Sequence, residues 1–139
     1  MLMTKLVKNT LPIAAFLGGA AVLIGAFGAH ALPDWLNNRG VLAEDMGRYQ
    51  DVFETGSEYH LVHSLALWGV GLFLLQHANR WAAAAVVNFL LGISIFSGCL
   101  YAYALTGINV LGAIVPLGGI ALIAGWLCLA MAAIKVCNR

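Results

Sequence analysis

Three histidines are the clearest candidates for chemistry in this sequence. His60 and His63 are spaced i, i+3, so a helix would carry them on one face, and His30 ends an earlier apolar stretch. Imidazole titrates near neutral pH, relays protons and ligates metals or haem iron. Tyr101 and Ser97, four residues apart, could face these histidines from a third helix. We name these five residues the polar cluster.

The polar cluster has two open interpretations. Neutral histidines bonded to tyrosine, serine or backbone would fix the register of the helices. Alternatively the cluster serves a cofactor or a proton, because an ionisable residue within a membrane span is a functional candidate. A metal held by His60 and His63 would need a third ligand from another helix, since Glu54 and Glu58 fall on the opposite face.

Recognisable catalytic motifs are missing from the sequence. It contains no HExxH or Cys-x-x-Cys motif, no phosphate-binding loop and no nucleophile–base arrangement. We therefore assign no catalytic residue and no metal ligand, leave the cofactor unknown, and expect a non-enzymatic role ahead of an enzymatic one.

The composition places the polar cluster in a membrane. The chain has 139 residues, of which 62% are hydrophobic and 9% charged, and its mean hydropathy is +0.90. A soluble domain carries about 25% charged residues, and disordered chains are polar and charge-rich. Seven basic residues against six acidic ones also exclude a basic nucleic-acid-binding domain. An integral membrane protein remains, with the lipid bilayer as its solvent.

Uncharged stretches predict four membrane-spanning helices in a single domain, residues 1–139. A helix needs about 20 apolar residues to cross the hydrocarbon. The short connections at residues 78–80 and 106–109 make successive spans antiparallel neighbours. The predicted fold is an all-α four-helix membrane bundle. Its spans lie near residues 11–32, 59–77, 81–105 and 110–134.

The charges are strongly segregated along the chain. All six acids lie between Asp34 and Glu58 with only two arginines, a net charge of −4, whereas the rest of the chain carries five basic residues and no acid. With four spans, both termini and Arg80 share one side, and that side holds five basic residues against two. The positive-inside rule then predicts that both termini are cytoplasmic in a bacterial inner membrane.

The acidic segment is predicted to be helical. Over residues 41–58 the apolar residues recur at spacings of three and four, with Asp51, Glu54 and Glu58 on the opposite face. This pattern predicts an amphipathic helix on the outer side, lying on the surface or running directly into the second span.

Small residues and one proline predict how the helices pack. Ala21 with Gly25, and Ala121 with Gly125, are spaced so that helix backbones can approach within the bundle or between copies. The same pattern occurs in the third span, at Ser94, Gly98 and Ala102. Pro116, inside the fourth span, predicts a helix kink.

Four motifs, together with the four-span layout, resemble the YgdD-like family. They are Gly25–His30 (GAFGAH), Tyr59–Ala66 (YHLVHSLA), Phe96–Tyr101 (FSGCLY) and Leu111–Gly119 (LGAIVPLGG). That family comprises small bacterial inner-membrane proteins of unknown function, with mitochondrial transmembrane relatives. The resemblance covers nearly the whole chain and extends to His30, His60 and His63. It implies a four-helix membrane protein and supplies no established catalytic residues.

Three kinds of function follow, in order of preference. The first is a structural or accessory component of a membrane complex, with a membrane-protein partner or further copies of the chain. The second is a small-solute or proton transporter that uses the outer His and Tyr residues, although spans two and four offer few polar residues in their inner halves. The third is a haem-, quinone- or metal-binding membrane protein.

Overall fold

The structure, a computed structural model, describes the backbone of residues 2–138 and the side chains of residues 8–138. Its regular elements are all helices over that range. They are α1 (Leu2–His30), α2 (Leu32–Asn38), α3 (Ala43–Gln76), α4 (Arg80–Gly92), the π-helical segment η1 (Ile93–Ser97), α5 (Gly98–Thr106) and α6 (Asn109–Cys137).

Four helical stretches are long and apolar enough to cross a membrane, which confirms the predicted all-α membrane bundle. They are Lys8–His30, Ala43–Gln76, Arg80–Thr106 and Asn109–Cys137. Large apolar side chains face outward along these helices: Phe16 on α1 is 79% exposed and Val110 on α6 is 68% exposed. Such a surface suits hydrocarbon and would be unstable in water.

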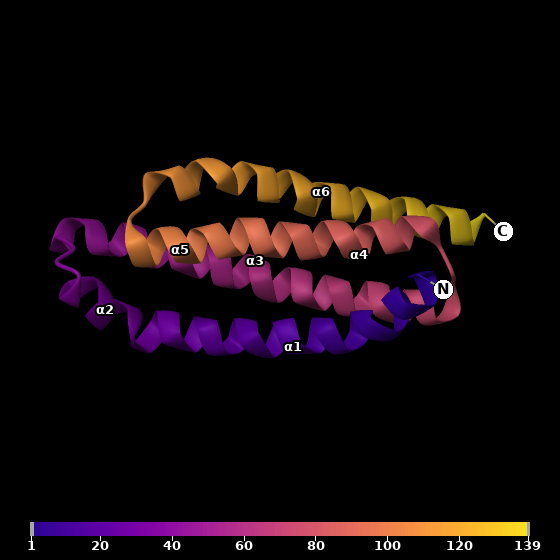
Figure 1. Cartoon of the computed structure of the whole chain (residues 1–139), viewed down its shortest axis with the longest axis horizontal. Helices are drawn as coiled ribbons and strands as arrows, with labels where there is room; N and C mark the ends of the chain where they lie inside the picture. The colour runs from indigo at the N-terminus through magenta and orange to yellow at the C-terminus, as the bar shows by residue number, and fades with distance from the viewer. Residues whose placement is uncertain (1, 139) are drawn as a thin grey trace.

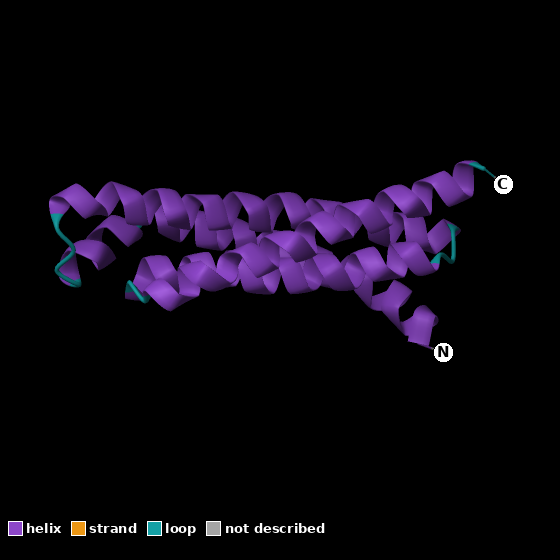
Figure 2. Cartoon of the chain, turned by 90° about the horizontal axis from the view of Figure 1, so that it is seen from above, coloured by secondary structure: helices purple, strands orange, loops and turns teal. Residues whose placement is uncertain are grey.

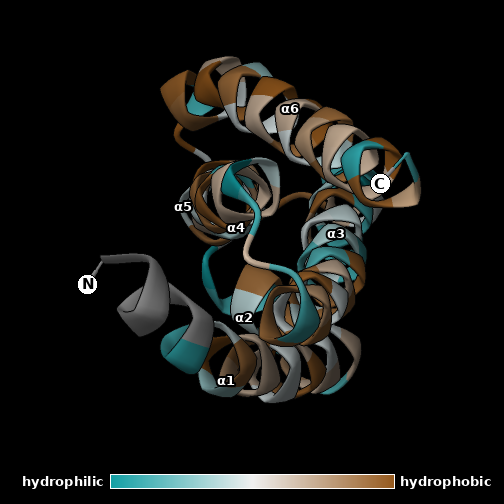
Figure 3. Cartoon of the chain, turned by 90° about the vertical axis from the view of Figure 1, so that its right-hand side faces the viewer, coloured by the Kyte–Doolittle hydropathy of each residue, from teal (hydrophilic) through white to brown (hydrophobic). Residues whose placement is uncertain are grey.

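The spans run side by side along one long axis (Figures 1 and 2). One end, here the terminal end, holds the start of α1, the end of α6 and the turn between α3 and α4. The opposite end, here the acidic end, holds α2, the start of α3 and the turn between α5 and α6. Helix α3 packs against α1 and against α4, η1 and α5, while α6 packs against α4, η1 and α5. Viewed along the axis, α1 and α6 lie on opposite sides of the molecule (Figure 3).

Helix α3 joins the predicted amphipathic segment to the second span without a break. Its 34 residues extend about 50 Å at about 1.5 Å per residue, well beyond the roughly 30 Å of hydrocarbon. The residues predicted as an outer-side amphipathic helix, 41–58, therefore form no separate surface helix, because residues 43–58 are the first turns of α3. Gly47 and Gly56 lie inside this helix and do not end it.

The interruption of helical geometry in the third span was not predicted. Five residues, Ile93–Ser97, form the π-helical segment η1. Helix α6 runs as one element through Pro116, so its predicted kink remains a prediction. Two residues past that proline, a Cβ on Gly118 would overlap the backbone nitrogen of Phe96 in η1. The backbones of α6 and η1 are therefore in direct contact.

Close helix packing uses small residues, although not all of those predicted. Gly28 of α1 faces the ring of Phe53, and Gly125 of α6 faces the ring of Phe89. The predicted face of the third span does not pack within the bundle at Ser94 and Gly98, which are exposed, and a Cβ on Gly98 would meet nothing within 4 Å; its packing between copies stays a prediction. The buried face of α4 combines other small residues, Ala82, Ala85 and Gly92, with the larger Val86 and Phe89.

Candidate functional site

His63 is a fully hydrogen-bonded link between α3 and α6. Its Nδ1 lies 2.7 Å from the backbone oxygen of Tyr59, an acceptor, so Nδ1 carries the hydrogen. Its Nε2 then has a free lone pair, which accepts the indole N–H of Trp126 at 3.1 Å. Both bonds need the neutral imidazole, because an imidazolium has no lone pair to accept from Trp126. His63 therefore serves as a helix clamp in its neutral form.

His60 links α3 to α5 with only one of its two ring nitrogens. Nδ1 lies 3.2 Å from the hydroxyl oxygen of Tyr101. Nε2 is buried and has no hydrogen-bond partner in the described structure. Ser97, at the end of η1, is also buried, and its hydroxyl likewise has no partner. The structure thus brings His60 together with Tyr101 and leaves two polar atoms of the cluster unpaired.

His30 lies apart from the other two histidines, contrary to the expectation that all three would meet. It is exposed at the end of α1. Gly28 packs against Phe53, so the antiparallel register places His30 beside residues 50 and 51 of α3. That is about ten residues, or about 15 Å along the axis, from His60.

His60 and His63 also turn toward different neighbours, because a spacing of three residues rotates a side chain by about 60° around the helix axis. His60 meets Tyr101 of α5, and His63 meets Trp126 of α6. Within the described residues, no group of three or more His, Cys, Asp or Glu side chains is placed to hold a metal.

Three residues that bind across helices were missed at the level of sequence. Trp126 lies well inside the fourth span, where an indole N–H needs a hydrogen-bond acceptor. This requirement could have indicated a bond from Trp126 to another helix. Arg39 donates to the backbone oxygen of Ala104 at 3.2 Å. Arg48 donates to the hydroxyl of Tyr103 at 2.6 Å. Both arginines of the acidic segment are therefore turned toward α5.

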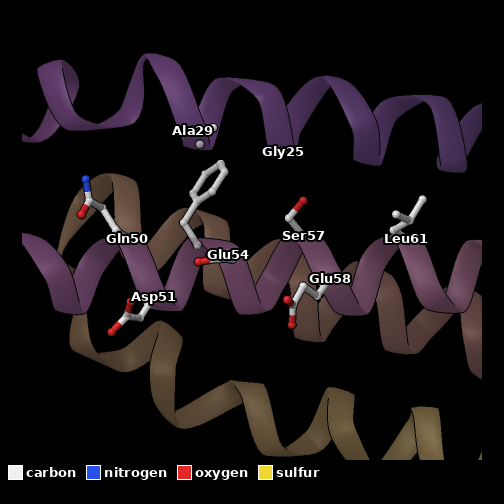
Figure 4. Close-up of a pocket in the computed structure, with 10 residues that line it drawn as sticks. Gly25, Ala29, Gln50, Asp51, Glu54, Ser57, Glu58 and Leu61 are labelled. Atoms are coloured by element: carbon white, nitrogen blue, oxygen red, sulfur yellow. The ribbon is translucent and has the colours of Figure 1, made fainter.

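A groove of about 460 Å³ lies between α1 and α3 in the acidic half (Figure 4). Gly25, Gly28 and Ala29 form its α1 side. The α3 side is largely polar and includes Gln50, Asp51, Glu54, Ser57 and Glu58. We name it the acidic groove.

A second groove, of about 500 Å³, lies between α3 and α6 over η1. It is lined mainly by aromatic and apolar side chains, with Tyr59, His63 and Trp126 among them. Both ring nitrogens of His63 and the indole N–H of Trp126 are already bonded, so the polar side chains of this second groove that remain without a hydrogen bond in the described structure are Glu58 and Tyr59.

The helices, the apolar outer surface and the polar cross-links define a four-span α-helical integral membrane protein. Residues 24–119 match the family described as "Protein of unknown function (DUF423)", and the chain belongs to this family.

The sequence is similar to those of curated relatives along most of its length. It is 38% identical over 117 residues to the UPF0382 membrane protein YwdK of Bacillus subtilis, covering 83% of this chain and 87% of the relative. It is 34% identical over 123 residues to the UPF0382 inner membrane protein YgdD of Escherichia coli, covering 88% and 87%. A UPF0382 membrane protein of Haemophilus influenzae is 34% identical over 125 residues, covering 90% and 93%. No solved structure matches the chain.

Proposed function

We propose that this protein is a non-enzymatic accessory component of a bacterial inner-membrane complex, and that it binds its partner at the acidic groove. The partner is a membrane protein that presents lysine or arginine near the outer end of a spanning helix. The proposal rests chiefly on one observation: the two arginines of the acidic segment bind α5, and among the side chains of residues 8–138 no other cation pairs with the carboxylates of the groove.

The geometry of the arginines supports this assignment. Arg39 lies over the ring of Tyr49, 4.8 Å from its centroid, and Arg48 bonds Tyr103. Asp51, Glu54 and Glu58 are exposed on α3 and line the groove shown in Figure 4. A carboxylate within or beside a membrane span is costly unless a cation or water compensates it. A basic side chain from a partner helix would supply that compensation.

The polar cluster supports a structural role for the interior. His60 and His63 each bond a residue of another helix, so these side chains hold the bundle together. Interhelical hydrogen bonds of this kind stabilise membrane proteins by roughly 0.6 kcal/mol on average. Binding at the surface, with a rigid interior behind it, is consistent with an accessory component.

The proposed orientation places the acidic groove on the outer side. The arrangement in Figure 1 puts both chain ends and the α3–α4 turn at the same end of the bundle. Among the residues whose backbone is described, that end carries Lys5, Lys8, Arg80 and Lys135, whereas Arg39 and Arg48 lie at the other end. The positive-inside rule then favours cytoplasmic termini. Cysteine labelling of Asn38→Cys and Asn138→Cys in intact cells tests this: a membrane-impermeant maleimide should label only the first.

Site-specific photocrosslinking tests the partner. A photoreactive phenylalanine at Leu61, which lines the groove, should crosslink one protein in intact cells. The same probe at Ile120, on the exposed face of α6, should not. The double variant Glu54→Gln, Glu58→Gln should lower the crosslink yield at Leu61 severalfold.

A matched acidic control separates the groove from general charge effects. Glu44→Gln removes a charge from the first turn of α3, outside the groove, and should leave the crosslink yield unchanged. Equal yields from Leu61 and Ile120, or a yield at Leu61 that is insensitive to the glutamine variants, would contradict the proposal. A crosslinked product of two copies of this chain would replace the hetero-partner with a homo-oligomer.

A further inference from the structure

Two buried polar atoms without a partner lie in the same layer of the bundle. They are His60 Nε2 and Ser97 Oγ, on side chains only 5% and 1% exposed. The third such atom in the described structure, Trp81 Nε1, lies at the terminal end, in the first turn of α4. An unpaired buried polar atom destabilises a folded protein, so two together indicate an unassigned hydrogen-bonding ligand.

Contacts on either side of Ser97 place it level with His60. Phe96, the residue before it, packs on Tyr59 with ring centroids 4.6 Å apart. Tyr101, four residues after it and on the same helical face, meets His60 at 3.2 Å. Helical side chains lean toward the N-terminus of their own helix, so Tyr101 leans back toward Ser97. The buried Ser97 side chain and the His60 ring therefore lie at the same level in the interior of the bundle.

The Ser97 hydroxyl lies where the backbone hydrogen-bonding pattern changes. Ser64 and Ser94 each donate to the carbonyl four residues earlier, those of His60 and Leu90, at 2.8 Å. The corresponding carbonyl for Ser97 is that of Ile93, which in η1 accepts the backbone N–H of Gly98, five residues on. The Ser97 hydroxyl makes no such bond in the described structure, and π-helical segments are frequent at functional sites.

The ligand must satisfy His60 in either tautomer. If Tyr101 donates to Nδ1, then Nε2 carries a hydrogen and needs an acceptor. If Nδ1 donates to Tyr101, then Nε2 has a lone pair and needs a donor. The Ser97 hydroxyl can donate or accept. A molecule that does both can therefore bridge the two atoms, which do not bond each other.

We propose that His60 Nε2 and Ser97 Oγ form a binding site for a single water molecule between α3 and η1. Water is the smallest ligand that can donate and accept at once, and a buried water takes two to four polar partners. The site lies in the acidic half of the bundle and is independent of the proposed accessory role, because it needs no partner protein.

Water-edited solid-state NMR on the full chain in lipid bilayers tests the site directly. With ¹⁵N-labelled histidine, magnetisation should transfer from water to the His60 ring, and this transfer should be lost in Ser97→Ala. His63, equally buried, is the internal control and should receive no comparable transfer. The resonances are assigned with His60→Gln and His63→Gln. Absence of transfer to His60 in the unaltered chain would overturn the proposal, as would equal transfer to both rings.

A double-mutant cycle gives an independent readout. Ser97→Ala should lower the thermal unfolding midpoint in detergent, and the loss should shrink when His60 is already Leu. The matched control is Ser94→Ala, whose hydroxyl is exposed and bonded to its own helix, and which should show no coupling to His60. An unchanged or raised midpoint in Ser97→Ala would overturn the proposal. Coupling without water transfer would indicate a direct bond between the side chains and would also overturn it.

Discussion

His63 and His60 lie three residues apart on α3 and are equally buried, yet their surroundings differ. His63 is bonded at both nitrogens, to the backbone of its own helix and to Trp126 of α6. His60 is bonded at one nitrogen, to Tyr101 of α5. Both ring nitrogens of His63 therefore have a protein partner, whereas Nε2 of His60 has none in the described structure. A shared helical face therefore does not imply a shared role.

The difference arises from the helices opposite each histidine. Around His63, α6 supplies an indole N–H at the right depth, and the rings of Phe89 and Trp126 pack on the imidazole. Around His60, the opposite helix changes from π-helical to α-helical geometry at Ser97 and Gly98. The Ser97 hydroxyl at this change of geometry has no hydrogen-bond partner in the described structure.

The largest loss of stability is expected from Gly118→Ala, which tests the close contact between the backbones of α6 and η1. The added Cβ would overlap the backbone nitrogen of Phe96, so the helices must separate and Trp126 must move relative to His63. We expect a loss of about 3 kcal/mol in the free energy of unfolding, measured by circular dichroism during titration with SDS in mixed micelles.

Gly98→Ala is the control for this substitution. An added Cβ at Gly98 meets nothing within 4 Å, and alanine favours a helix over glycine by up to about 1 kcal/mol. Stability should hold or rise. Equal losses from the two variants would show that the contact at Gly118 is not special.

The next largest effect is expected from His63→Leu, which keeps an apolar side chain but removes the acceptor for Trp126. The indole N–H of Trp126 would then lack an acceptor, which should lower the free energy of unfolding by about 2 kcal/mol. Trp126→Phe removes that N–H, so it should cost less in the His63→Leu background than in the unaltered chain, as the unfolding titration would show. Additive losses would mean that the bond contributes nothing, and the description of His63 as a clamp would fail.

The smallest effect is expected from His60→Leu. It removes the bond to Tyr101 and one of the two polar partners proposed for the bound water, both neutral bonds between helices, so we expect a loss of about 1 kcal/mol or less in the same titration. The contrast between the two histidines depends on this order. A loss as large as that of His63→Leu would show that His60 is as fully engaged as its neighbour.

Local patterns predicted the fold well. Uncharged stretches separated by Asn79-Arg80 and by Thr106–Asn109 identified the four spans, because the cost of burying charge in lipid acts on each segment alone. The same patterns did not show that α3 continues from Ala43 to Gln76. Amphipathic periodicity shows which residues share a face of a helix. It does not show whether the helix over residues 43–58 continues straight into the second span or bends away from it. The charges likewise did not show that Arg39 and Arg48 turn toward α5, which left the carboxylates of the groove unpaired.

The candidate site was predicted only in part. His60 and Tyr101 do meet, and Ser97 is buried one turn before Tyr101, whereas His30 is displaced because the packing of Gly28 on Phe53 sets the register of α1 against α3. Periodicity within one helix cannot give the axial offset between two helices. Nor did any residue type in Ile93–Ser97 signal the π-helical segment, which accompanies the close contact of Gly118 with Phe96.

Composition and charge order were enough to establish a four-span membrane protein with an acidic, polar half, because solvation is a property of each residue and its near neighbours. Three other features depend on contacts between residues far apart in the chain. They are the hydrogen bond of Trp126 to His63, the position of His30 away from the other histidines, and the absence of a partner for the Ser97 hydroxyl in the described structure. Those contacts follow from how small and large side chains interlock across helices. This interlocking makes one histidine a clamp and leaves the other facing a site for a ligand.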